Sequence, residues 1–199
     1  HYGNDAVKAK KEYRKGVEQY FVNIAKYVSS EVPSIIFYEY TKVDEAAISS
    51  LEIGEMELSP FEYIISAMRQ SGLSVSAVWP VRTEKSREDF DSVRVAIVFH
   101  KSDNGDEQTT RRSFINVLKR ELYGTIVPIL HSETDESDYQ LSVMGKGISI
   151  YARYKNILNA DGSPMSVHDA MQVIYQEAKD QIQNYEDAIE QGLATSEEE

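Results

Sequence analysis

Apolar residues recur at three- and four-residue spacing near both ends of the chain, which is the pattern of amphipathic helices. The first stripe spans residues 6–29, and we expect Pro33 to end this helix. The second spans residues 166–190 and starts at a capping box of Ser166 and Asp169. The stripes are Val17, Tyr20, Phe21, Ile24, Tyr27 and Val28 in the first helix, and Val167, Met171, Ile174, Ala178, Ile182, Tyr185 and Ile189 in the second.

Three segments in the first half of the chain have the pattern of strands. Residues 34–40 read SIIFYEY, a β-branched and aromatic run that indicates a strand buried on most sides. Residues 73–79 and 93–99 alternate with a period of two. We expect these two to form an antiparallel hairpin with one buried face, on which Trp79 points inward.

Local signals predict a helix between the first strand and this hairpin. Ser59, Pro60 and Glu62 supply an N-cap, a first-turn proline and a capping box, and Gly72 follows the last turn. The acidic connector before this helix, residues 41–58, can hold one more short helix.

The segment from residue 110 to residue 155 is predicted to hold a helix and a second hairpin. Residues 110–123 form the helix, with Gly124 beyond its end. The run TIVPIL is a short strand, which Pro128 places at a sheet edge because it cannot donate a ladder hydrogen bond. The alternation changes phase across Gly145-Lys146-Gly147, which predicts a hairpin turn there. A phosphate loop is disfavoured, because its lysine would precede Ser or Thr and open a helix.

These elements predict an α+β fold: a mostly antiparallel sheet of about five to six strands packed with helices, flanked by long amphipathic N- and C-terminal helices. We divide the chain into an N-terminal helix (1–32), an α+β core (33–160), and an acidic C-terminal helix with a disordered tail (161–199). The element order expected for residues 60–155 is similar to that of small helix–hairpin–helix–hairpin proteins that form rings in bacteriophage tails and necks. No motif residue carries this likeness.

The composition narrows the classes of function. Of the 199 residues, 41% are hydrophobic and 27% charged, which is typical of a folded globular domain. The chain has no cysteine, which excludes disulfides, thiolate nucleophiles and thiolate metal sites. Its net charge of −12 disfavours nucleic acid as a partner, and no apolar run approaches the roughly 20 residues of a membrane helix. We expect a soluble protein, cytoplasmic or virion-associated.

Two histidines are candidates for catalysis or metal binding. His100 and His131 both fall at the ends of predicted strands. If those strands were neighbours, the imidazoles could share a metal or a proton with Asp103 or Glu133. Their spacing is not a zinc signature, and we favour surface histidines.

A set of acids in the connector could offer oxygen ligands to a divalent cation. The set lacks the regular spacing and the turn glycine of a calcium loop, so a solvated connector is the favoured interpretation. We therefore assign no catalytic, cofactor-binding or metal residue, and we expect no cofactor. The acids are Asp44, Glu45, Glu52, Glu55 and Glu57.

The leading hypothesis is a non-catalytic binding or assembly subunit, such as a structural component of a phage-type ring, with a protein partner or a second copy as its partner. The chain has thirteen tyrosines, a residue enriched at interfaces, and its terminal helices carry opposite charge. The alternatives are a hydrolase or phosphate-ligand enzyme that uses His100, His131 and loop carboxylates, or a small-ligand sensor. The candidate interface residues are Lys8, Lys11, Arg14, Lys15, Glu177, Glu186 and Glu190.

Overall fold

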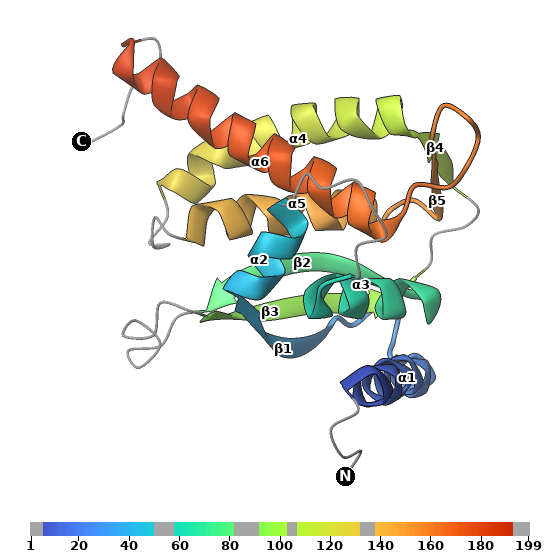
Figure 1. Ribbon diagram of the computed structural model, residues 1–199. Helices are drawn as coiled ribbons and strands as arrows, with labels where there is room; N and C mark the ends of the chain where they lie inside the picture. Colours follow the sequence, from blue (N-terminus) through green and yellow to red (C-terminus); the bar gives the residue numbers. More distant parts are fainter. Residues whose placement is uncertain (1–5, 50–57, 82–91, 103–106, 132–137, 193–199) are drawn as a thin grey trace.

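The computed structural model has an α+β architecture built on a small antiparallel sheet (Figure 1). The sheet has three strands in the order β1-β3-β2, and a separate parallel pair joins β4 to β5. The strands are β1 (Ser34–Thr41), β2 (Leu73–Val81), β3 (Ser92–Lys101), β4 (Gln108–Thr110) and β5 (Asn156–Leu158). The structure describes residues 6–49, 58–81, 92–102, 107–131 and 138–192.

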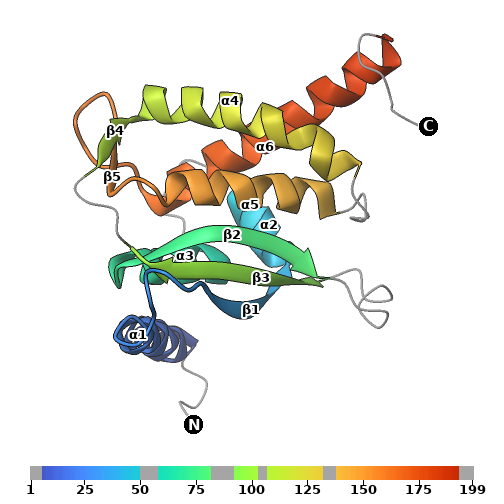
Figure 2. The ribbon, with the colours of Figure 1, turned by 180° about the vertical axis from the view of Figure 1, so that it is seen from behind.

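Helices cover one face of the sheet and both of its edges. In Figure 1, α2 and α3 lie in front of the sheet, α4, α5 and α6 form a layer beyond the β2 edge, and α1 lies beyond the β1 edge. Seen from behind in Figure 2, the opposite face carries no helix of the described chain. None of the described helices is long and apolar enough to cross a membrane. The helices are α1 (Ala6–Ile24), α2 (Lys42–Ser49), α3 (Pro60–Gln70), α4 (Arg111–Leu130), α5 (Tyr139–Tyr151) and α6 (Val167–Glu190).

Several predicted boundaries are confirmed because local chemistry sets them. The Ser59 hydroxyl accepts the amide hydrogen of Glu62, whose carboxylate accepts that of Ser59 at 2.7 Å, so the capping box closes. Gly72 follows α3 with a φ of +75°, a conformation that suits glycine. The Ser166 side chain caps α6 by accepting the amide hydrogen of Asp169.

The predicted second hairpin is wrong, since residues 139–151 form the helix α5. Leu141, Met144, Ile148 and Tyr151 recur at helical spacing and are all buried. The alternation read from the sequence coexists with this spacing because α5 is buried on nearly every side. Without a polar face, a helix shows no clear 3.6-residue period in the sequence. Because these residues are helical, the structure has fewer strands than predicted. The likeness to helix–hairpin–helix–hairpin ring proteins also fails, because it needed this hairpin.

The predicted strand TIVPIL is also wrong, because these residues continue α4. The helix runs past Gly124 and ends at Leu130, with His131 as its C-cap and Ile126 buried against the core. Pro128 lacks the amide hydrogen that would bond to the Gly124 carbonyl, and the Thr125 hydroxyl donates to the Leu122 carbonyl at 2.8 Å. Both features are known causes of helix bending. Gly124 and Pro128, which the sequence suggested as the end of a helix and a sheet edge, therefore lie inside one helix.

Two predictions about strand burial are wrong, and both concern residues on the uncovered face of the sheet. A register shift between Val75 and Ala77 reverses the phase of β2, so Val78 faces the core and Trp79 is 54% exposed. On β1, Ile35 and Phe37 are 56% and 65% exposed, so this strand is not buried on most sides. Phe37 and Trp79 flank Ala96 in one row across the sheet.

Candidate functional site

A group of exposed apolar side chains follows α1, the turn after it and the edge strand β1. Tyr13 and Tyr20 are about half exposed, and Tyr27 is 88% exposed one more heptad along. Tyr13 and Tyr20 lie on one side of α1, because residues seven apart share a side of a helix, and Tyr27 follows in the turn after the helix. Two grooves join these tyrosines to β1: one of about 390 Å³ lined by Tyr13, Tyr20 and Phe37, and one of about 510 Å³ lined by Tyr27 and Ile35. We call these five residues the α1–β1 face.

Helix α1 is fixed to the rest of the fold by its other side. Phe21 is 2% exposed and belongs to the core. The Tyr63 hydroxyl of α3 donates to the Glu18 carboxylate, and the Arg14 guanidinium lies 5.3 Å from the centre of the Tyr63 ring. Burial, followed by the hydrogen bond to Glu18, raises the pKa of Tyr63 to about 12. Tyr13 and Tyr20 therefore sit on an anchored helix.

The predicted basic residues lie on α1 but on another side of the helix from the tyrosines, since Lys11 and Lys15 are each two positions from Tyr13. Lys8, Lys11 and Lys15 are exposed, whereas Arg14 is half-buried against Tyr63. Cations near the start of a helix are disfavoured by the helix dipole, so an acidic partner at α1 would offset this unfavourable interaction.

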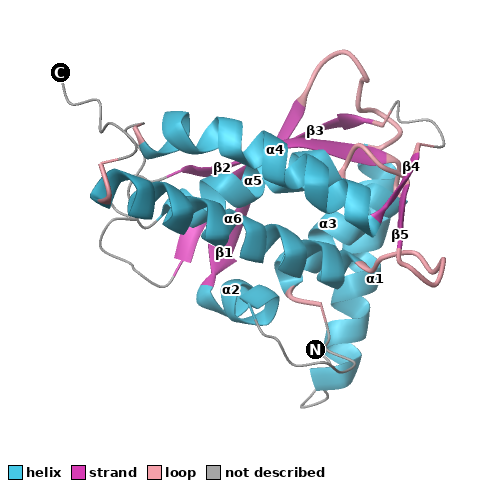
Figure 3. Ribbon diagram, turned by 90° about the horizontal axis from the view of Figure 1, so that it is seen from above, coloured by secondary structure: helices cyan, strands magenta, loops and turns pink. Residues whose placement is uncertain are grey.

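The predicted acidic residues of α6 differ in accessibility. Glu186 and Glu190 are exposed on the last two turns. Glu177 is 9% exposed, accepts a hydrogen bond from Gln181 and lies 3.9 Å from the Lys119 ammonium, so it faces α4. Figures 1 and 3 place the end of α6 and the helix α1 on opposite sides of the molecule. The two sets are not brought together within one chain.

The Gly145-Lys146-Gly147 segment is neither a turn nor a phosphate loop. It lies in the middle of α5, where a Cβ on Gly145 would come within 2.2 Å of the Val78 carbonyl oxygen. A Cβ on Gly147 would come within 2.4 Å of the Ile174 side chain. The glycines thus allow α5 to approach the sheet on one side and α6 on the other. The Lys146 ammonium pairs with the Glu121 carboxylate at 3.4 Å.

His100 and His131 have different neighbours. The Nδ1 atom of His100 lies 2.8 Å from the Ser76 hydroxyl on β2, and His131 caps the end of α4 with its Nε2 3.0 Å from the Tyr185 hydroxyl. His131 is not at a strand end as predicted. Among the residues that the structure describes, no group of three His, Asp or Glu side chains could hold a metal ion.

The acidic connector is only partly described. Asp44 is buried and accepts hydrogen bonds at 3.0 Å from the backbone amides of Thr41 and Phe61, so it is a structural acceptor. Glu45 is exposed. Glu52, Glu55 and Glu57 lie outside the described residues.

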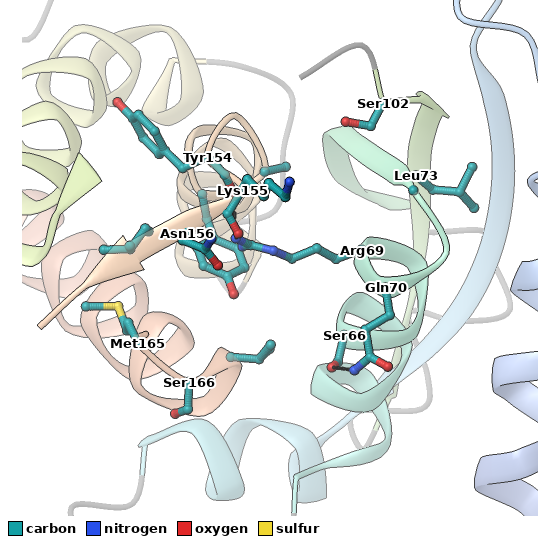
Figure 4. A pocket seen from close by; sticks show the side chains of 15 residues that line it. Ser66, Arg69, Gln70, Leu73, Ser102, Tyr154, Lys155, Asn156, Met165 and Ser166 are labelled. Carbon is teal, nitrogen blue, oxygen red and sulfur yellow. Dashed lines mark hydrogen bonds between the residues drawn. The ribbon is translucent and has the colours of Figure 1, made fainter. Parts of the chain in front are cut away.

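A cavity with polar and apolar lining that the sequence did not indicate lies between α3 and the segment after α5 (Figure 4). Its volume is about 590 Å³, and Arg69 extends across it from the last turn of α3 toward Tyr154 and Lys155. The residues involved are far apart in the chain and follow no motif spacing. Only the fold brings them together.

No protein-family model, no curated protein and no solved structure matches this chain.

Proposed function

We propose that this protein is a non-catalytic assembly subunit whose copies associate head to tail. In this arrangement the α1–β1 face of one copy receives the acidic end of α6 of the next. The observation that carries the proposal is the exposure of five large apolar side chains on the α1–β1 face, whose helix α1 also carries exposed lysines on another side. Single exposed apolar residues are ordinary, but contiguous patches mark interaction sites.

Charge complementarity selects a second copy as the occupant. The chain carries a net charge of −12, so two copies repel each other over most of their surfaces. Lys8, Lys11 and Lys15 make α1 a basic region, and Glu186 with Glu190 make the end of α6 acidic. Opposite charge at opposite sides of one molecule favours a heterologous contact, which closes into a ring or continues as a filament.

The test compares two tyrosines of similar type on different surfaces. Tyr20 lies on the α1–β1 face and is 53% exposed, while Tyr123 lies on α4 and is 73% exposed. Analytical ultracentrifugation of the wild type should show oligomers that weaken with salt, because screening shortens the range of charge interactions. Tyr20→Ser should lower the association constant at least about tenfold, by loss of buried apolar area, and Tyr123→Ser should leave it unchanged. A monomeric wild type at low salt and high concentration would overturn the proposal.

A further inference from the structure

The cavity around Arg69 is a candidate ligand site that is separate from the α1–β1 face. None of the residues of that face lines it. Its walls come from the end of α3, the start of β2, the segment after α5 and the start of α6. Figure 4 shows the side chains of Ser66, Gln70, Asn156 and Ser166 arranged around the space that Arg69 crosses. A volume of about 590 Å³ is in the range of small-molecule pockets.

Arg69 is held rigidly without a carboxylate. Its Nη2 atom donates to the backbone carbonyls of Tyr154, at 2.6 Å, and Lys155, and its guanidinium lies 4.3 Å from the centre of the Tyr151 ring. No acid of the described chain lies within ion-pair distance of it. Its Nη1 atom is buried and has no hydrogen-bond partner among these residues. An orphaned donor of this kind commonly marks a bound water or ion.

The rest of the cavity adds positive potential and hydrogen-bond donors. Lys155 is a second cation on the wall, and Ser66, Gln70 and Asn156 are neutral donors. Ser166 and Val167 bring the start of α6 to the cavity, where the first backbone amides of a helix have no partner within it. Acids also stand near the cavity. Asp169 accepts the Ser166 hydroxyl hydrogen and so serves its own helix, and Glu62 lies 2.7 Å from the His168 Nδ1 atom. The backbone carbonyl of Glu107 accepts the amide hydrogen of Lys155.

We propose that this cavity binds a small organic anion that carries a phosphate or carboxylate group. The fixed charge of Arg69 and the neutral donors suit the anionic group, since guanidinium is the preferred partner of both oxyanions. Leu73, Ile157 and Met165 also line the cavity and add apolar surface to it, so the cavity suits an anion with an organic body.

The experiment uses two probes with the same ring, phenyl phosphate and benzoate, in titration calorimetry at constant ionic strength. Saturable binding of either probe, with none for chloride, is expected. Asn156→Asp and Gln70→Glu each place a carboxylate on the cavity wall and should weaken binding at least about tenfold by charge repulsion. Both substitutions keep the shape of the side chain. The carboxylate that Gln70→Glu introduces can accept the Ser66 hydroxyl hydrogen, which replaces the present 3.0 Å contact between Gln70 and Ser66.

The matched control is Asn116→Asp, the same chemical change on the exposed side of α4. It alters the net charge equally, so binding within about twofold of the wild type separates a local effect from a global one. Stronger binding of one probe identifies the anionic group. The proposal is overturned if neither probe binds, or if the cavity variants and the control bind equally. Because no variant touches the α1–β1 face, failure here leaves the assembly proposal standing.

Discussion

At the residue scale, Asp44 shows how burial changes the meaning of an acid in the sequence. In the sequence it belongs to an acidic run and is interpreted as solvated. In the fold it is 1% exposed and joins β1, α2 and α3 by accepting hydrogen bonds from Tyr38, Thr41 and Phe61. Burial of a carboxylate is tolerated only when its lone pairs are occupied, and those donors come from residues up to 17 positions away. Local sequence does not reveal them.

This network predicts a large effect from a small substitution. Asp44→Asn turns one acceptor oxygen into a donor that faces other donors, and it should lower the free energy of unfolding by about 2–4 kcal/mol. Urea denaturation at neutral pH measures the change. Glu45→Gln removes the same charge from the exposed neighbouring position and should stay within about 0.5 kcal/mol. Equal effects of the two variants would show that charge alone matters.

Tyr40 predicts an alkaline loss of stability. Burial first, and then the charges of Glu45 and Asp44, raise the pKa of Tyr40 far above its ordinary value. A raised folded-state pKa gives stability that is complete below about pH 10, the unfolded value, and is lost as the pH rises further. At about pH 11 the loss from this one group should be about 1.4 kcal/mol.

Tyr40→Phe keeps the ring and removes the ionisable hydroxyl. Urea denaturation at neutral pH and at about pH 11 should therefore show a smaller alkaline loss in this variant than in the wild type. Tyr123→Phe is the control, because that side chain is 73% exposed. If both variants lost stability equally with pH, other groups would govern the alkaline transition.

At the scale of elements, the sequence predicts what neighbouring residues determine. The capping box of α3, the Ser166 cap of α6, the α3 boundary at Gly72 and the pairing of β2 with β3 depend on contacts within a few residues or on a clear period. The reciprocal half of the capping box predicted for α6 is absent, because the Asp169 carboxylate accepts the Ser166 hydroxyl hydrogen. Helix α5 could not be predicted because its surroundings are apolar on nearly all sides, which removes the polar face. No sequence pattern indicates the bulge in β2, yet this bulge turns Trp79 outward.

The glycines of α5 give a test of the packing that replaces the predicted turn. Gly145→Ala would place a Cβ 2.2 Å from a backbone carbonyl that cannot rotate away, and should cost about 1–3 kcal/mol or more. Gly147→Ala meets the Ile174 side chain, which can adjust, and should cost less. Gly124→Ala is the control: it has open space in α4 and should stabilise by about 0.5–1 kcal/mol. Thermal denaturation ranks the three, and a harmless Gly145→Ala would contradict the close approach of α5 to β2.

At the scale of the whole molecule, charge could be predicted from sequence but accessibility could not. The sequence alone shows that the first helix is basic and the last helix acidic. The structure places α1 and the end of α6 on opposite sides of the molecule. The inward position of Glu177 and the exposure of Phe37 depend on which surfaces the helices leave uncovered. The Arg69 cavity belongs to the same class, because its walls meet only after folding.

Head-to-tail association predicts a result from mixing that a symmetric contact does not. One variant carries Lys8→Gln, Lys11→Gln and Lys15→Gln, which weakens the basic surface and leaves its acidic end intact. A second carries Glu186→Gln and Glu190→Gln, which does the reverse. Each variant alone should be monomeric. An equimolar mixture should form a dimer that does not grow, because the one intact end of each copy meets the other and both remaining ends are neutralised.

Sedimentation of the separate variants and of the mixture measures this outcome, with low salt to strengthen the charge interaction. A two-fold symmetric contact would use the same patch on both copies, so it would survive in the variant whose patch is intact and would gain nothing from mixing. Oligomers in the α6 variant alone would therefore place the contact on the α1–β1 face of both copies. Growth of the mixture beyond a dimer would show that neither end governs assembly.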